Sequence, residues 1–159
     1  MDSGIPCERC GTFSEATSQL AERKLCSPCV SRAASQRYWP SGYLSGVGAL
    51  LNPGLAAILL TLNYRRLGDE KQARSWGIVA ACLTAFYVAV MVFSLPIPSG
   101  ALVGAGIFGG VTIGKNWEAP WNTLKAKGAL RANVWLPPLL VVVIALAVGA
   151  AVVLLHPEE

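Results

Sequence analysis

The sequence predicts a mainly α-helical, polytopic membrane protein with a small cysteine-rich head at its N-terminal end. Three observations lead to this fold class. Hydrophobic residues make up 53% of the 159 residues and charged residues only 14%, whereas charged residues average about 25% in soluble domains. The apolar residues are concentrated after Tyr38. Four of the five cysteines lie within the first thirty residues. We therefore expect a head over residues 1–38 and a membrane domain over residues 39–159.

The head contains two Cys-x-x-Cys pairs, Cys7 with Cys10 and Cys26 with Cys29, with fifteen residues between them. Each pair offers two soft sulfur ligands at a tight turn, and this spacing is typical of a four-thiolate zinc site. Gly11 follows the first pair and permits the left-handed backbone of a knuckle turn. A short helix is expected after the second pair. The order of knuckle, hairpin, knuckle and helix predicts a treble-clef-like head.

Two other interpretations of the cysteine pairs stay open, namely redox-active Cys-x-x-Cys motifs and structural disulfides. Zinc is favoured because fewer than about forty residues cannot bury enough apolar area to fold alone. No thioredoxin-like βαβ pattern surrounds either pair. Cys82 stands apart in an apolar stretch and is interpreted as a small buried hydrophobic residue.

Residues 7–11 (Cys-Glu-Arg-Cys-Gly) and 25–32 (Leu-Cys-Ser-Pro-Cys-Val-Ser-Arg) resemble phrases of small zinc-ribbon, B-box and LIM-type modules. The resemblance implies a protein-interaction role with zinc as the cofactor. It departs from classical nucleic-acid-reading fingers, since the head has ligands for one metal site and no histidine. Residues 1–37 carry five basic and four acidic side chains. Nucleic acid is therefore not an expected partner, because phosphate binding needs a strongly positive surface.

Four apolar segments follow the head, and each is a candidate to cross the membrane. A helix needs about twenty apolar residues to cross a hydrocarbon core of roughly 30 Å. None of the four contains an internal Asp, Glu, Lys or Arg. The segments are residues 43–62, 76–95, 97–113 and 134–155. We expect three firm helices and a first segment that is broken or re-entrant.

The connecting loops carry the orientation signal. Basic side chains in loops mark the cytoplasmic side of a membrane protein. They are Arg65, Arg66, Lys71 and Arg74 between the first two segments, and Lys115, Lys125, Lys127 and Arg131 between the last two. Both loops are therefore expected in the cytoplasm, with the lipid bilayer as a partner of the chain.

The first segment has Asn52, Pro53 and Gly54 at its centre, a combination that breaks helices. Two interpretations remain. A re-entrant helix-break-helix segment would keep the zinc head in the cytoplasm, where thiolates stay reduced, whereas a proline-kinked span would export the head. We favour the re-entrant segment and a cytoplasmic head.

The third segment is rich in glycine at small-xxx-small spacing. The glycines are Gly100, Gly104, Gly106, Gly109, Gly110 and Gly114. This spacing favours close helix packing within the chain. The alternatives are a homo-oligomer interface and a solute path.

Residues 63–68 (Asn-Tyr-Arg-Arg-Leu-Gly) after a broken apolar helix resemble a phrase of uncharacterised small bacterial multi-pass membrane proteins. This resemblance implies a location in the bacterial inner membrane. It implies no activity.

Taken together, these features favour a non-enzymatic, membrane-anchored zinc-binding protein that acts as an interaction partner or scaffold for an unidentified protein. His156 is the one histidine, so no catalytic set of the Ser/His/Asp or Cys/His kind can be assembled. The alternative is a subunit of an oligomeric channel or transporter with a regulatory zinc head.

Overall fold

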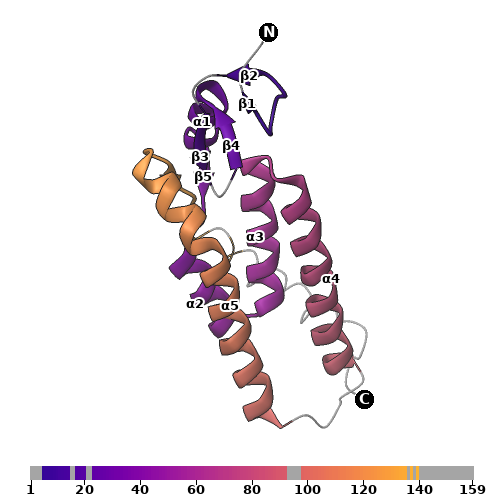
Figure 1. Cartoon of the computed structure of the whole chain (residues 1–159). Coiled ribbons are helices and arrows are strands. Elements are labelled where there is room, and N and C mark those ends of the chain that lie inside the picture. The colour runs from indigo at the N-terminus through magenta and orange to yellow at the C-terminus, as the bar shows by residue number, and fades with distance from the viewer. Residues whose placement is uncertain are drawn as a thin grey trace.

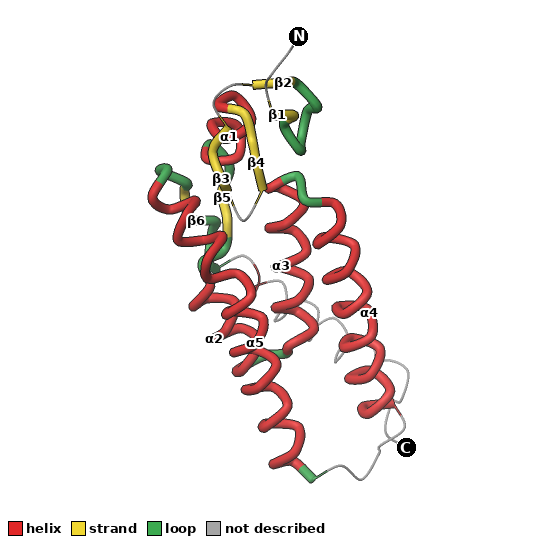
Figure 2. Tube along the Cα trace, viewed as in Figure 1, coloured by secondary structure: helices red, strands yellow, loops and turns green. Residues whose placement is uncertain are grey.

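The computed structural model of the chain describes residues 5–14, 17–20, 23–92, 98–135, 137 and 139. Within these residues, short strands and one short helix form a head at one end of the molecule, and four longer helices form the body (Figure 1). The colours of Figure 2 separate the two parts, since nearly all strands lie in or beside the head.

The head is built from two short hairpins and a helix. Strand β1 (Ile5–Pro6) pairs antiparallel with β2 (Phe13–Ser14), and β3 (Thr17–Leu20) pairs antiparallel with β4 (Arg23–Cys26). Helix α1 (Ser27–Ala34) follows β4 directly. Proline near the helix start is well tolerated there, because its missing N–H would have no partner in the first turn. The head thus consists of a turn, a hairpin and a short helix in this order along the chain.

The first apolar segment forms a helical hairpin rather than one helix. Helix α2 (Ser41–Leu50) ends before Asn52, and α3 (Pro53–Leu67) begins immediately after it. The side chain of Asn52 caps α3, since its Oδ1 accepts a hydrogen bond of 2.6 Å from the N–H of Gly54. Gly48 lies against Ala56 across the hairpin. The chain therefore reverses direction at the predicted break and returns to the head end.

Helix α4 (Glu70–Val92) packs along α3, and α5 (Ser99–Ala126) packs mainly along α2 (Figure 1). Gly68 separates α3 from α4 with a φ of +82°, a left-handed conformation that suits glycine. The N–H of Asp69 donates to the carbonyl of Tyr64 at 2.9 Å, which closes the end of α3. The tip of the α2–α3 hairpin reaches only the middle of α4, where Gly54 lies against Thr84.

Two glycines of the third apolar segment pack against α2 of the same chain. A Cβ on Gly110 would lie 2.6 Å from the backbone N of Ala49 and 2.6 Å from the backbone O of Ser45, both on α2. A Cβ on Gly114 would lie 2.9 Å from the backbone O of Ser41, the first residue of α2. These two glycines let the backbones of α2 and α5 approach closely, as intramolecular packing requires. Gly104, by contrast, has no atom within 4 Å of its Cβ position.

The head joins the body through a buried junction around Trp39. Tyr38 and Trp117 are fully buried, and their ring centroids lie 5.9 Å apart. The indole N–H of Trp117 donates to the carbonyl of Trp39 at 3.0 Å. Strand β5 (Arg37–Tyr38) also pairs in parallel with β6 (Leu130–Arg131), which follows α5. The segment that leaves the head is therefore held by α5 and by the strand that follows it.

The expected set of three to four membrane-spanning helices is wrong for the part of the chain that the structure describes. There, one helix is long and apolar enough to cross a membrane, by length and composition: residues Glu70–Val90 of α4. Residues 43–62 are divided by the turn at Asn52 into two pieces. Residues 97–113 lie largely in the first half of α5, where the many glycines contribute little hydrophobicity. The second half of α5 is polar and charged, so the helix as a whole is not apolar enough to count as a span.

The fourth predicted segment, residues 134–155, lies almost entirely outside the described residues. The α4 candidate is poorly covered by the rest of the chain, since only 11% of its apolar window is buried. Its outer side chains include exposed Ile78, Phe86 and Val88. This helix therefore presents apolar surface that water would not favour.

Candidate metal centre

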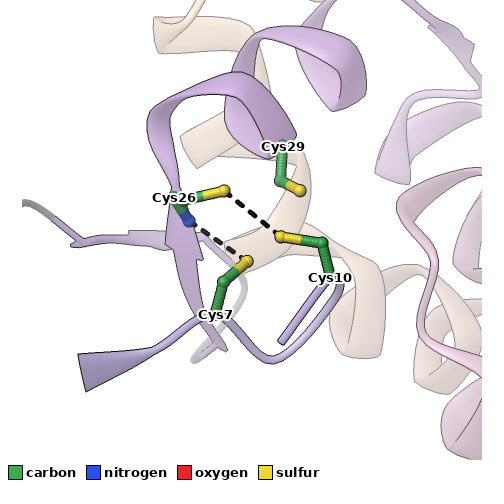
Figure 3. A group of neighbouring side chains, drawn as sticks. All are labelled: Cys7, Cys10, Cys26 and Cys29. Carbon is green, nitrogen blue, oxygen red and sulfur yellow. Dashed lines mark hydrogen bonds between the residues drawn. The ribbon is translucent and has the colours of Figure 1, made fainter. Parts of the chain in front are cut away.

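The four cysteines of the two Cys-x-x-Cys pairs come together in the head. Their sulfur atoms all lie within 4.8 Å of one another. Figure 3 shows the sulfur atoms of Cys7, Cys10, Cys26 and Cys29 gathered close together, the first pair from the turn after β1 and the second from the end of β4 and the start of α1. Cys7, Cys26 and Cys29 are buried, whereas Cys10 is exposed. The four predicted site residues thus form one cluster.

The first pair sits on a tight turn between β1 and β2. The N–H of Gly11 donates to the carbonyl of Cys7 at 2.8 Å, and the N–H of Cys7 donates to the carbonyl of Thr12 at 2.9 Å. Gly11 has a φ of +74°, a conformation that costs glycine little and other residues more. The turn places both sulfurs on the same side of the hairpin.

The second pair sits where β4 passes into α1. Cys26 is the N-cap residue of α1, and Cys29 lies in its first turn. The positive end of the helix dipole and the free N–H groups of the first turn favour anionic groups at this place. Local helix geometry therefore brings the second pair of sulfurs together.

Hydrogen bonds connect the two pairs. The backbone N–H of Cys26 donates to the Sγ of Cys7 at 3.3 Å, and the Sγ atoms of Cys10 and Cys26 lie 3.6 Å apart (Figure 3). Behind the cluster, the N–H of Glu8 donates to the carbonyl of Lys24 at 3.1 Å, and the N–H of Lys24 donates to Oε1 of Glu8 at 3.2 Å. These bonds fasten the knuckle to β4.

The surroundings of the four thiols shift their pKa values in different directions. The N–H hydrogen bond from Cys26 is the main reason that the pKa of Cys7 is lowered to about 6. Burial, reinforced by the neighbouring thiols, raises the pKa of Cys29 to about 12. Four thiolates at these distances repel one another, so a cation is needed to hold all four in the charged form.

The donor set fits a metal ion. Zinc–sulfur bonds of about 2.3 Å in a tetrahedron place neighbouring sulfurs about 3.8 Å apart. The observed distances, 3.6 Å between Cys10 and Cys26 and at most 4.8 Å within the cluster, are close to this value. The structural disulfide alternative requires sulfurs about 2.05 Å apart, and all four cysteines are free thiols here. The cluster could therefore hold a metal ion.

Thr12 contacts one of the four cysteines, and the spacing of the cysteines in the sequence did not reveal this contact. Its Oγ1 lies 2.8 Å from the Sγ of Cys10, and this hydrogen bond lowers the pKa of that exposed thiol. A hydroxyl residue two positions after the second cysteine of a knuckle is a weak signal. It gains meaning only once the turn brings the two side chains together.

The expectation for Cys82 was half right. Cys82 is not part of the cluster, in agreement with the sequence interpretation. However, its side chain is exposed on α4 rather than buried, because it does not lie on the face of α4 that packs against α3 within the described residues.

Comparison of the chain with models of known protein families, with curated proteins and with solved structures gave no match.

Proposed function

We propose that this chain is a membrane-anchored zinc protein whose head is a docking module for another protein. The observation that carries the proposal is the converging set of four thiols, mounted at one end of a helical body with an exposed apolar helix. Soft sulfur ligands in this number and geometry select zinc or iron. Zinc is the better candidate because the spacing of the two pairs is that of structural zinc modules.

The metal has a structural role in this proposal. Four protein ligands fill a tetrahedral site, whereas catalytic zinc keeps one position open for water or substrate. The head is small, and in it Cys7, Cys26 and Cys29 are among the few buried side chains. Zinc therefore supplies folding free energy that the short chain cannot obtain from apolar burial. We accordingly propose a binding function and no enzymatic one.

The distribution of charged residues along the chain supports attachment to a membrane with the head on the cytoplasmic side. Residues 75–114 contain no Asp, Glu, Lys or Arg, whereas Arg65, Lys71 and Arg74 lie around the α3–α4 turn beside the head. Such an arrangement agrees with the positive-inside rule. The proposed membrane is the bacterial inner membrane, on the strength of the phrase at residues 63–68.

Phe13 is our candidate for the centre of the docking surface. It follows the knuckle in β2 and has 58% of its surface exposed. Exposed aromatic side chains on a rigid support are common anchors at protein interfaces. The neighbouring cluster supplies the rigidity, so docking should depend on both Phe13 and the metal.

The test is site-specific crosslinking in membranes of cells that make the full chain, with a photoreactive residue at Lys24. We expect a discrete partner adduct that disappears in Phe13→Ala and Cys26→Ser. Matched variants far from the head, Phe108→Ala and Cys82→Ser, should retain it, since both side chains are exposed on helices of the body. An adduct that persists in Cys26→Ser would rule out a metal-dependent docking head.

A further inference from the structure

An open apolar groove runs between α3 and α4. It has a volume of about 640 Å³. Small residues such as Gly77, Ala81 and Ala85 line it on α4, and exposed Ile58 and Leu62 line it on α3. The lining residues of α4 extend from Gly77 to Val88, which at about 1.5 Å per residue is about 16 Å. The groove is thus long enough to hold part of a flexible hydrocarbon chain.

One end of the groove is cationic. Arg65 lines it at the head end and is exposed. Thr61 lies opposite Gly77 across the two antiparallel helices, so Arg74, one turn before Gly77, is level with Arg65. In the part of the chain that the structure describes, no salt bridge engages either arginine, and no acidic residue lines the groove. The groove therefore changes from positive to apolar along its length.

We propose that this groove binds a phospholipid with an anionic headgroup, whose phosphate contacts Arg65 and whose acyl chain lies along Gly77, Ala81 and Ala85. The inference rests on the proposed membrane attachment. A charged head followed by an apolar tail matches the charge gradient of the groove in sign and direction. A second copy of the chain, inserted in the membrane with the same orientation, fits less well, because a two-fold axis along the helices would put the two Arg65 side chains at the same level.

The experiment measures lipid binding to the full chain, purified with its metal in detergent, by native mass spectrometry. The probes are phosphatidylglycerol and phosphatidylcholine with identical acyl chains. We expect the anionic lipid to bind at least about fivefold more tightly. Arg65→Gln should remove most of this preference, and Ala81→Leu should weaken binding of both lipids because the larger side chain occupies space in the groove. Arg32→Gln, in the head, and Ala105→Leu, on the exposed face of α5, are the matched controls.

Three results would overturn the proposal. The first is equal binding of both lipids by the wild-type chain. The second is competition by inorganic phosphate alone at the concentration of the bound lipid, which would show an ion site without an acyl groove. The third is a dimer, in place of lipid adducts, that Ala81→Leu abolishes. Metal content and membrane retention are measured on the same preparations, so failure of the lipid site is distinguishable from failure of the proposed function.

Discussion

The side-chain amide of Asn63 pairs with both backbone groups of Trp39. Its Oδ1 accepts a hydrogen bond from the Trp39 N–H at 3.1 Å, and its Nδ2 donates to the Trp39 carbonyl at 3.0 Å. Asn63 is fully buried in α3. The amide therefore satisfies the hydrogen-bonding capacity of both backbone groups of Trp39 inside the protein. Trp39 is the residue at which the head joins the body.

Replacing Asn63 with leucine should destabilise the junction. The Trp39 N–H would lose its partner in a buried place, which costs about 1–3 kcal/mol, whereas the carbonyl would keep the indole of Trp117. Thermal unfolding in detergent, followed by tryptophan fluorescence, measures the effect. The control is Asn122→Leu, at an exposed site on α5, where about 0.5 kcal/mol or less is expected. Equal shifts for the two variants would contradict the assigned role of Asn63.

Gly110 and Gly104 should respond in opposite ways to alanine. A methyl group on Gly110 would collide with the backbone of α2, which cannot move as a side-chain end can. We expect Gly110→Ala to destabilise the chain by about 1–3 kcal/mol. Gly104→Ala meets no atom within 4 Å and should be neutral or stabilise the helix by up to about 1 kcal/mol. The same thermal unfolding assay decides between them, and a harmless Gly110→Ala would disprove the close contact of α2 with α5.

Part of this architecture could be predicted from local sequence. Asn52 and Pro53 indicated a helix break because the amide caps a helix and proline starts one, both of which are effects within a few residues. The number of spanning helices could not be predicted from apolar stretches alone. Gly110 and Gly114 looked like membrane-helix glycines, yet their packing partner is a short helix more than sixty residues earlier in the chain. Apolar length does not reveal which surface a helix buries.

The affinity of the protein for its metal should depend on Cys26 and not on Cys82. Cys26→Ser removes one of four ligands and exchanges a soft sulfur for a poor oxygen donor, so purified full-length protein should lose at least about tenfold in metal affinity. Cys82→Ser changes a thiol that lies outside the cluster and should leave metal content unchanged. Competition with a chromogenic chelator gives both affinities. Comparable metal loss in the two variants would contradict the ligand assignment.

Acid should release the metal, because protons compete for the thiolates. The pKa of Cys7 is lowered to about 6 by the N–H of Cys26. A lowered pKa keeps the thiolate charged above that value, so its contribution is lost as the pH falls through about 6 and below. We expect full metal retention at neutral pH and progressive loss in this acid range. Metal content after gel filtration at a series of pH values measures it, and a metal content that stays unchanged throughout the acid range would contradict thiolate ligands.

The candidate site was more predictable than the body. Cys-x-x-Cys spacing sets sulfur positions through one turn and one helix start, and both are local structures. Two features required the folded chain. The contact of Thr12 with Cys10 depends on the shape of the turn, and the exposure of Cys82 depends on which face of α4 meets α3. Neither is encoded in the spacing of neighbouring residues.

The central claim is that Cys7, Cys10, Cys26 and Cys29 hold one zinc ion. Metal analysis combined with X-ray absorption spectroscopy on the purified full-length protein tests it most directly. We expect one zinc per chain with four sulfur neighbours at about 2.3 Å. Metal-free folded protein, nitrogen or oxygen atoms among the ligands, or disulfide bonds between these cysteines would contradict it.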